Sequence, residues 1–210
     1  MILFYADIHG YFHDFIKVYN EYKDLVDTVI LLGDQCPDEP LDNIFSRIDC
    51  SVFFVLGNHD SDRQRWLTNH FPVWNNHIHC RIVESAGHIK IAGLSGVFRE
   101  DIWIPTQQYP PYFPTREQYR YYFKARSKKN PNFWLIDNYL PKKHWSTIFP
   151  EDIDRLLELE ADILVCHEAP SSHEYGFEVV DEIAEAMGLA SLCMVIITQI
   201  TDLEVKAGLM

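Results

Sequence analysis

Short apolar runs alternate with amphipathic stretches along most of this chain. The apolar runs are rich in Val, Ile, Leu and Phe and have the length of buried β-strands; they span residues 2–6, 28–32, 51–56, 89–94 and 162–167. Apolar residues recur at helical spacing in residues 11–23, 150–160 and 178–188. Pro150, followed by acidic residues, is typical of a helix start, and Gly188 is typical of a helix end. Strands that alternate with helices predict a layered α/β fold, and continuous apolar strands predict sheets that are covered on both faces.

Polar residues directly follow four of these predicted strands. The strands run into the sequences ADIHG, LGDQC, LGNHD and VCHEAP, which contribute Asp7, His9, Asp34, Asn58, His59 and His167. Because the carboxyl ends of the strands line the ligand crevice of an open α/β sheet, we expect these side chains to converge.

The types of these side chains indicate a metal site. Asp7 and His9 are two positions apart, so in an extended chain they point the same way. Asp34 follows a glycine, and Asn58 offers an amide oxygen. Mixed oxygen and imidazole ligands suit Mn, Fe, Zn or Ni, and two such ions can clamp a phosphoryl group for in-line attack. Each motif alone is also a common turn, but four in order, each after a strand, favour a phosphoester hydrolase.

Taken together, the DIHG, GDQCP, GNHD and CHEAP motifs resemble those of the calcineurin-like metallophosphoesterase superfamily, over residues 1 to about 190. The resemblance implies that Asp7 and His9 bind a first divalent metal ion, that Asp34 bridges two ions, and that Asn58 and His167 bind the second. It also implies an αββα sandwich, in which two facing mixed sheets are flanked by helices. The whole chain, residues 1–210, is predicted to form this single domain.

The same resemblance implies hydrolysis of phosphate mono- or diesters by a metal-bound hydroxide. His59 is predicted to protonate the leaving group or to hold the phosphate, and Asp60 is a second catalytic candidate. Arg99, together with Asn58 and His59, is predicted to bind the substrate. The substrate class stays open between a small molecule, a nucleotide and a phosphoprotein, and so does the oligomeric state.

The superfamily ends its ligand set with Gly-His-x-His, which nothing after His167 matches. His173 lies too close to His167 in the sequence to substitute for the missing motif. If the codons of Cys193, Val195, Ile196 and Ile197 end in C, however, another reading frame encodes His-Gly-His-His-His at this place. We therefore predict that residues 193–210 are the product of a frameshift after Leu192. The alternative is a genuine terminal strand, which would leave each metal ion one ligand short.

Charge and composition narrow the class of protein. The net charge of −13 argues against general affinity for nucleic acid or an anionic membrane. No apolar stretch is long enough to span a bilayer, and the first residues lack the basic start of a signal peptide. The five cysteines are scattered and form no CxxC pair, which is typical of reduced thiols. We therefore expect a cytoplasmic protein. No HExxH, GxGxxG or P-loop motif is present.

Residues 98–150 differ from the rest of the chain. This segment holds nine of the 18 Lys and Arg residues, four of the 31 acids and 14 of the 29 aromatic residues. One interpretation is an insertion or cap whose cations contact substrate phosphate while its aromatic rings stack on substrate. The other is an excursion whose aromatic rings pack on the sheet. The segment also allows a different function, a catalytically weak pseudoenzyme that binds phosphorylated ligands or RNA.

Overall fold

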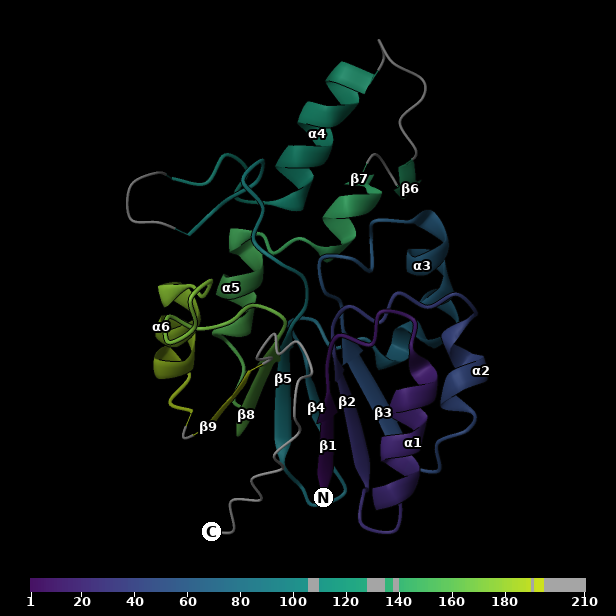
Figure 1. Ribbon diagram of the computed structural model, residues 1–210. Helices are drawn as coiled ribbons and strands as arrows, with labels where there is room; N and C mark the ends of the chain where they lie inside the picture. Colours follow the sequence, from purple (N-terminus) through teal and green to yellow (C-terminus); the bar gives the residue numbers. More distant parts are fainter. Residues whose placement is uncertain (106–109, 128–134, 138–139, 190, 195–210) are drawn as a thin grey trace.

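The computed structural model (Figure 1) describes residues 1–105, 110–127, 135–137, 140–189 and 191–194 of the chain. For residues 127, 135–137 and 191–194 it describes the backbone alone. All five predicted strands are present, within a residue or two of the expected bounds.

One sheet is entirely parallel. It has the order β1 (Ile2–Tyr5), β2 (Thr28–Leu32) and β3 (Ser51–Val55). Helices α1 (Phe12–Tyr22), α2 (Leu41–Phe45) and α3 (Gln64–Asn69) lie on the outer side of this sheet, to the right in Figure 1. The α1 helix matches the predicted amphipathic stretch, whereas α2 and α3 are too short for their periodicity to predict them.

The second sheet is mixed. It has the order β4 (Ile82–Glu84), β5 (Lys90–Leu94), β8 (Ile163–Cys166) and β9 (Ser191–Met194). Only the β4–β5 pair is antiparallel among these described strands. Helices α5 (Pro150–Leu156) and α6 (Glu178–Ala186) lie on the opposite outer side, to the left in Figure 1.

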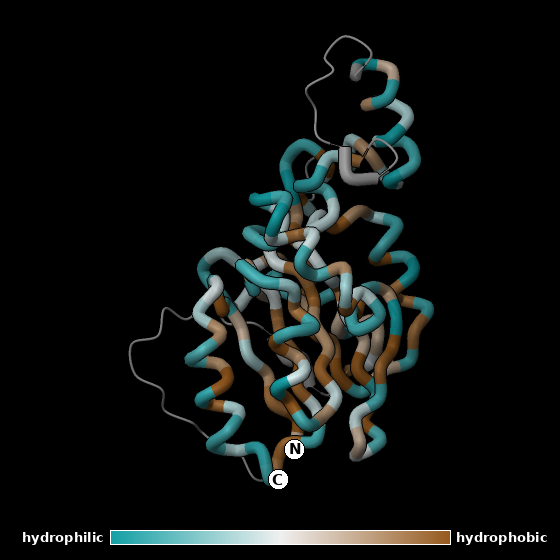
Figure 2. The backbone as a smooth tube through the Cα atoms, turned by 90° about the vertical axis from the view of Figure 1, so that its right-hand side faces the viewer, coloured by the Kyte–Doolittle hydropathy of each residue, from teal (hydrophilic) through white to brown (hydrophobic). Residues whose placement is uncertain are grey.

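Alternating side chains of a strand pack into two different hydrophobic cores, one between the sheet and its helices and one between the two sheets. In β2, Val29 and Leu31 pack among the residues of α1 and α2, whereas Ile30 joins Ile91 and Val165 of the other sheet. Because successive strand residues point to opposite faces, one continuous apolar strand fills both layers. The brown segments in the interior of Figure 2 are these strands. The two sheets therefore face each other with helices outside, which confirms the predicted αββα architecture.

The chain forms a strand, β9, at the point where the predicted frameshift begins. β9 pairs parallel to β8, with Val165 opposite Cys193 and Cys166 opposite Met194. Residues 195–210, most of the tail that we attribute to a frameshift, lie outside the described residues, so that origin stays a prediction.

Some of the described aromatic residues of the 98–150 segment pack against one another, whereas Trp145 contacts Phe71 outside the segment and Tyr112 and Tyr121 are exposed. The segment contains α4 (Arg116–Ser127), β6 (Leu135–Asp137), β7 (Leu140–Pro141) and the 3-10 helix η2 (Lys142–Ser146). Tyr119 of α4 forms a small core with Ile102, Leu140 and Phe149. Both views show α4 standing away from the two sheets, above the carboxyl ends of the parallel strands. None of the described helices is long and apolar enough to cross a membrane.

Candidate metal centre

Two tight turns at the ends of β1 and β2 carry the first candidate ligands. Asp7, His9 and Asp34 all have positive φ angles, of 52°, 46° and 54°. The turns are held side by side, because the His9 amide donates to the Asp34 carbonyl at 2.8 Å and the Asp7 amide donates to the Gly33 carbonyl at 3.2 Å. Such left-handed backbone is uncommon outside glycine and persists where the surroundings enforce it. Asp7 and His9 thus converge through a strained turn, and the predicted extended geometry is wrong.

The predicted ligands come together as expected. Ligand atoms of Asp7, Asp34 and His167 all lie within 4.8 Å of one another. His9 Nε2 lies 3.7 Å from Asp7 Oδ1 and 4.0 Å from Asp34 Oδ2. On the other side, His167 Nε2 lies 3.7 Å from Asp34 Oδ2 and 3.2 Å from Asn58 Oδ1. The Asp34 carboxylate therefore lies between the two imidazoles.

The hydrogen bonds of His167 fix which nitrogen faces the cluster. Its Nδ1 lies 2.8 Å from the Leu32 carbonyl oxygen, which can only accept, so Nδ1 carries the proton. In the neutral ring Nε2 then presents a lone pair toward the Asn58 amide oxygen. Two facing lone pairs repel each other unless a cation lies between them. A histidine that binds a metal ion through one ring nitrogen usually donates a hydrogen bond from the other, often to a backbone carbonyl, as His167 Nδ1 does here.

The charges of the cluster also favour a cation. Burial raises the pKa of Asp7, and the nearby Asp34 carboxylate raises it further, against the opposing effect of His167 and His9. Asp34 itself is only 3% exposed. Closely spaced buried carboxylates are costly unless a positive charge neutralises them. The mixed oxygen and nitrogen ligands fit Mn, Fe, Zn or Ni.

Asp60 is buried against the backbone of the loops that carry Asp34 and Asn58. Its side chain is fully buried, and its carboxylate accepts hydrogen bonds from the backbone amides of Asp34, Cys36 and Gly57 at 2.9, 2.8 and 2.8 Å. Burial raises the pKa of Asp60 to about 7, and the Asp34 carboxylate contributes in the same direction. The structure shows no route from this carboxylate to a substrate, which argues against the predicted catalytic role. Its contacts are those of a residue that positions the two ligand loops.

His59, in contrast, lies on the open side of the site. Its side chain is 48% exposed, its ring centre is 5.5 Å from that of His9, and its Nδ1 lies 2.7 Å from Asp62 Oδ2. Burial lowers the pKa of His59, but the hydrogen bond with Asp62 and the charge of Asp34 outweigh it and raise the pKa. His59 is therefore accessible and inclined to carry a proton.

Arg99 supports the Asn58 loop from the side. Its Nη2 donates to the Asn58 carbonyl at 3.2 Å and to Ser146 Oγ at 3.3 Å, and its Nε donates to Thr147 Oγ1 at 3.1 Å. These contacts are with protein groups, so the predicted contact of Arg99 with substrate stays a prediction.

Sequence reasoning missed the residues that hold these ligands in place. A Cβ atom on Gly33, whose φ is +103°, would lie 2.3 Å from His167 Nδ1, and a Cβ atom on Gly57 would lie 2.2 Å from Asp34 Oδ1. The glycines of LGD and LGN are visible in the sequence, but the side chains that approach them are not. The Asp62 partner of His59 was missed for the same reason.

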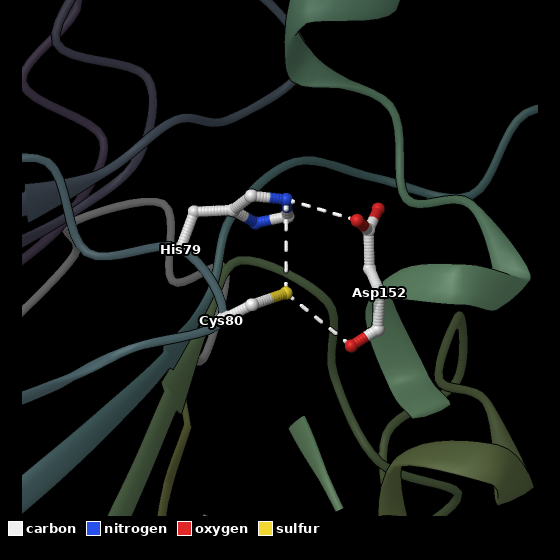
Figure 3. Close-up of side chains that lie close together, drawn as sticks. All are labelled: His79, Cys80 and Asp152. Atoms are coloured by element: carbon white, nitrogen blue, oxygen red, sulfur yellow. Dashed lines mark hydrogen bonds and ion pairs between the residues drawn. The ribbon is translucent and has the colours of Figure 1, made fainter. Parts of the chain in front are cut away.

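A second group of candidate ligands comprises His79, Cys80 and Asp152 (Figure 3). The Ser95 amide donates to His79 Nδ1 at 3.3 Å, so in the neutral ring Nε2 carries the proton and donates to Asp152 Oδ1 at 3.1 Å. The Arg116 guanidinium also binds this carboxylate oxygen. Burial raises the pKa of Cys80 to about 12, and its thiol donates to the Asp152 carbonyl at 3.3 Å. Arg116 therefore already supplies the positive charge, which makes this group a structural ion pair.

Comparison with solved structures supports the fold. The chain is similar to the Thermus thermophilus protein TT1561, whose crystal structure is known, with a TM-score of 0.52 and 16% sequence identity over 92% of this chain and 80% of that one. At this identity the likeness concerns the fold alone.

Sequence comparisons support a family. The chain is 33% identical to an uncharacterized protein of Haemophilus influenzae over 196 residues, which cover 90% of this chain and 79% of that protein. A family model described as calcineurin-like phosphoesterase matches residues 1–194. That match includes every ligand motif of the cluster around Asp34. The chain therefore belongs to the calcineurin-like phosphoesterase family.

Proposed function

We propose that this protein hydrolyses phosphate mono- or diesters with two divalent metal ions held by the cluster around Asp34. Family membership supports a metal-dependent phosphoesterase in general. The observation that carries the finer proposal is the position of the Asp34 carboxylate, whose Oδ2 lies 4.0 Å from His9 Nε2 and 3.7 Å from His167 Nε2. One carboxylate between two sets of ligands is suited to bridge two ions.

In this proposal Asp7 and His9 would hold one ion, Asn58 and His167 would hold the other, and the Asp34 carboxylate would be available to both. When bound, divalent ions supply Lewis acidity toward the phosphoryl oxygens and lower the pKa of a coordinated water. The protein supplies the geometry, since paired turns, the Asp60 carboxylate and the Leu32 carbonyl fix the ligands in advance.

His59 is the proposed proton donor. Its raised pKa favours the imidazolium near neutral pH, and Asp62 Oδ2, 2.7 Å from Nδ1, holds the ring so that Nε2 is available to substrate. An imidazolium there can donate to the leaving-group oxygen or to a phosphoryl oxygen. We propose that Asp60 positions the loops and that Arg99 braces Asn58 from the side.

The two ligands that the superfamily supplies from its Gly-His-x-His motif have no counterpart among the described residues that follow His167. If the chain ends naturally as written, we expect weaker metal binding and slower turnover than with a complete set.

The test is hydrolysis of p-nitrophenyl phosphate and bis(p-nitrophenyl) phosphate by protein that has been stripped with a chelator and then titrated with Mn²⁺. We expect activity that depends on Mn²⁺ and falls by at least about 100-fold in Asp34→Asn, which loses the bridging charge. Asp38→Asn is the matched control, because Asp38 lies four residues away in the same loop but is exposed and pairs with Arg65.

Metal-independent hydrolysis, or equal activity in both variants, would contradict the proposed site. Mn²⁺ binding without turnover of either ester would instead favour the pseudoenzyme.

A further inference from the structure

A pocket of about 480 Å³ lies between η1 (Phe71–Asn76), α4 and η2, apart from the metal centre. Its wall includes Trp74, His77, Arg81, Arg116, Arg120 and Trp145, hereafter the arginine–tryptophan pocket. No acidic residue is among the described residues that line it, although the chain as a whole carries a net charge of −13. None of the candidate metal ligands around Asp34 contributes to its wall.

One side of the pocket is aromatic. The ring centres of Trp74 and Trp145 lie 5.5 Å apart with an interplanar angle of 74°, and His77 packs against Trp74 at 4.4 Å. Trp145 Nε1 is buried and has no hydrogen-bond partner among the residues that the structure describes. Because this atom is buried, Trp145 offers a ligand its ring surface and no hydrogen bond.

The other side is cationic. Arg116 is held rigidly, since it binds Asp152 and donates to the Thr147 carbonyl at 3.0 Å. Asp152 and Glu151 balance its charge. Arg81 is exposed and donates to the Asn75 carbonyl, and no carboxylate partner of Arg81 is found among the described residues. Arginine is the preferred residue for bidentate binding of phosphate and for stacking on flat rings.

We propose that the arginine–tryptophan pocket binds a small phosphorylated molecule that carries a flat ring, such as a nucleoside monophosphate. The volume lies within the usual range for ligand pockets, about 300–1,000 Å³. The arginines would hold the phosphate, and the tryptophans would contact the ring. Two of the arginines and one tryptophan come from the basic, aromatic 98–150 segment, so part of that segment serves recognition while the rest packs.

A chain of hydrogen bonds through Thr147 and Arg99 connects the pocket to the Asn58 loop of the candidate metal centre. The Thr147 carbonyl accepts from Arg116 in the pocket, while its hydroxyl accepts from Arg99, which in turn donates to the Asn58 carbonyl. Binding at the pocket does not need the metal ions, so the proposal can be tested separately from hydrolysis.

The experiment is isothermal titration of the chelator-treated protein with adenosine monophosphate, adenosine and inorganic phosphate. We expect the monophosphate to bind more tightly than either part. Arg81→Ala should weaken its binding by about tenfold or more, because a hydrogen bond to a charged group is lost. Trp145→Phe, which leaves a smaller ring against Phe71 and Trp74, should weaken it by about two- to tenfold through lost ring contact.

Two controls separate this site from the others. Arg65→Ala removes an exposed arginine that pairs with Asp38 outside the pocket, and Asp34→Asn disables the proposed metal centre; both should bind the monophosphate as the parent does. The proposal is overturned if no monophosphate binds at millimolar concentration, if binding is as tight for inorganic phosphate, or if Asp34→Asn abolishes binding while Arg81→Ala and Trp145→Phe do not change it. Circular dichroism of each variant verifies that it is folded.

Discussion

The replacement of Asp60 by asparagine tests whether this residue positions the ligand loops or takes part in the chemistry. The buried carboxylate accepts three backbone hydrogen bonds, two at Oδ2 from Asp34 and Gly57 and one at Oδ1 from Cys36. An asparagine keeps an oxygen in one position only. Its amide group must then face at least one backbone N–H, so one donor loses its acceptor.

The expected loss follows from that count. A hydrogen bond to a charged group contributes about 1.5–3 kcal/mol, and a buried donor without a partner costs about 1–3 kcal/mol. Burial, and then the Asp34 carboxylate, raise the pKa of Asp60 to about 7, so above this pH the removal of an unfavourable buried charge offsets the loss. Below this pH, we expect Asp60→Asn to lower the free energy of unfolding by about 1–3 kcal/mol.

The assay is urea denaturation at pH 6 in the presence of a chelator, below the pKa of about 7, where the charge of Asp60 contributes little. The exposed Asp38→Asn variant is the control and should change stability by less than about 1 kcal/mol. Isothermal titration with Mn²⁺ should show weaker binding in Asp60→Asn, because two ligand loops lose their shared anchor. Parent-like stability and Mn²⁺ affinity combined with lost turnover would refute the positioning role and restore the catalytic one.

The remaining predictions concern packing, pH, metal and the C-terminal sequence. Gly33→Ala should destabilise the protein by about 2–4 kcal/mol and weaken Mn²⁺ binding, because its Cβ would meet His167; Gly87→Ala, whose Cβ meets only one atom at 3.8 Å, should do neither in the same denaturation and titration assays. Burial raises the pKa of Asp152, but His79 and Arg116 lower it more, so the stabilising effect of Asp152 is present above pH about 4 and declines as the pH falls through the lowered folded-state pKa. Urea denaturation should show Asp152→Asn to be about 3 kcal/mol less stable than the parent at neutral pH, and this difference should narrow in acid. A difference that stays constant with pH would contradict the ion pair of Asp152 with His79 and Arg116. Saturating Mn²⁺ should stabilise the protein by about 2.7 kcal/mol at 100 times the Kd, seen as a higher Tm, and an unchanged Tm would exclude tight binding. Sequencing the source DNA across the codons that follow Leu192 should reveal a shift that restores His-Gly-His-His-His, and an unaltered frame would show that the strand is genuine.

Five of the described strands, β1, β2, β3, β5 and β8, were predictable because each lies in a continuous apolar run, whereas the short strands β4, β6 and β7 were not predicted. β2 shows this most clearly, since all five of its residues are buried. The α4 helix was not predicted, because its aromatic residues pack in a local cluster outside the two-sheet core and its mean composition is polar. The spacing of apolar residues predicts a helix well when one face packs against a large core, and α4 packs against only a small core.

The clustering of the candidate ligands was predictable because the chain places them directly after strands, but the residues that support them were not predictable. Asp60 binds the amides of residues 34 and 36, which are 26 and 24 positions away. His79 meets Asp152 across 73 positions, and Thr147 links Arg99 to Arg116. Contacts over such separations depend on the complete fold, and no spacing in the sequence encodes them.

The most direct test of the metal centre is a crystal structure of the Mn²⁺-loaded protein with anomalous scattering recorded for manganese. We predict two anomalous peaks that flank the Asp34 carboxylate, one within bonding distance of Asp7 and His9 and the other within bonding distance of Asn58 and His167. Peaks at His79, Cys80 and Asp152 instead, or no peak beside Asp34 at saturating Mn²⁺, would contradict the proposed centre.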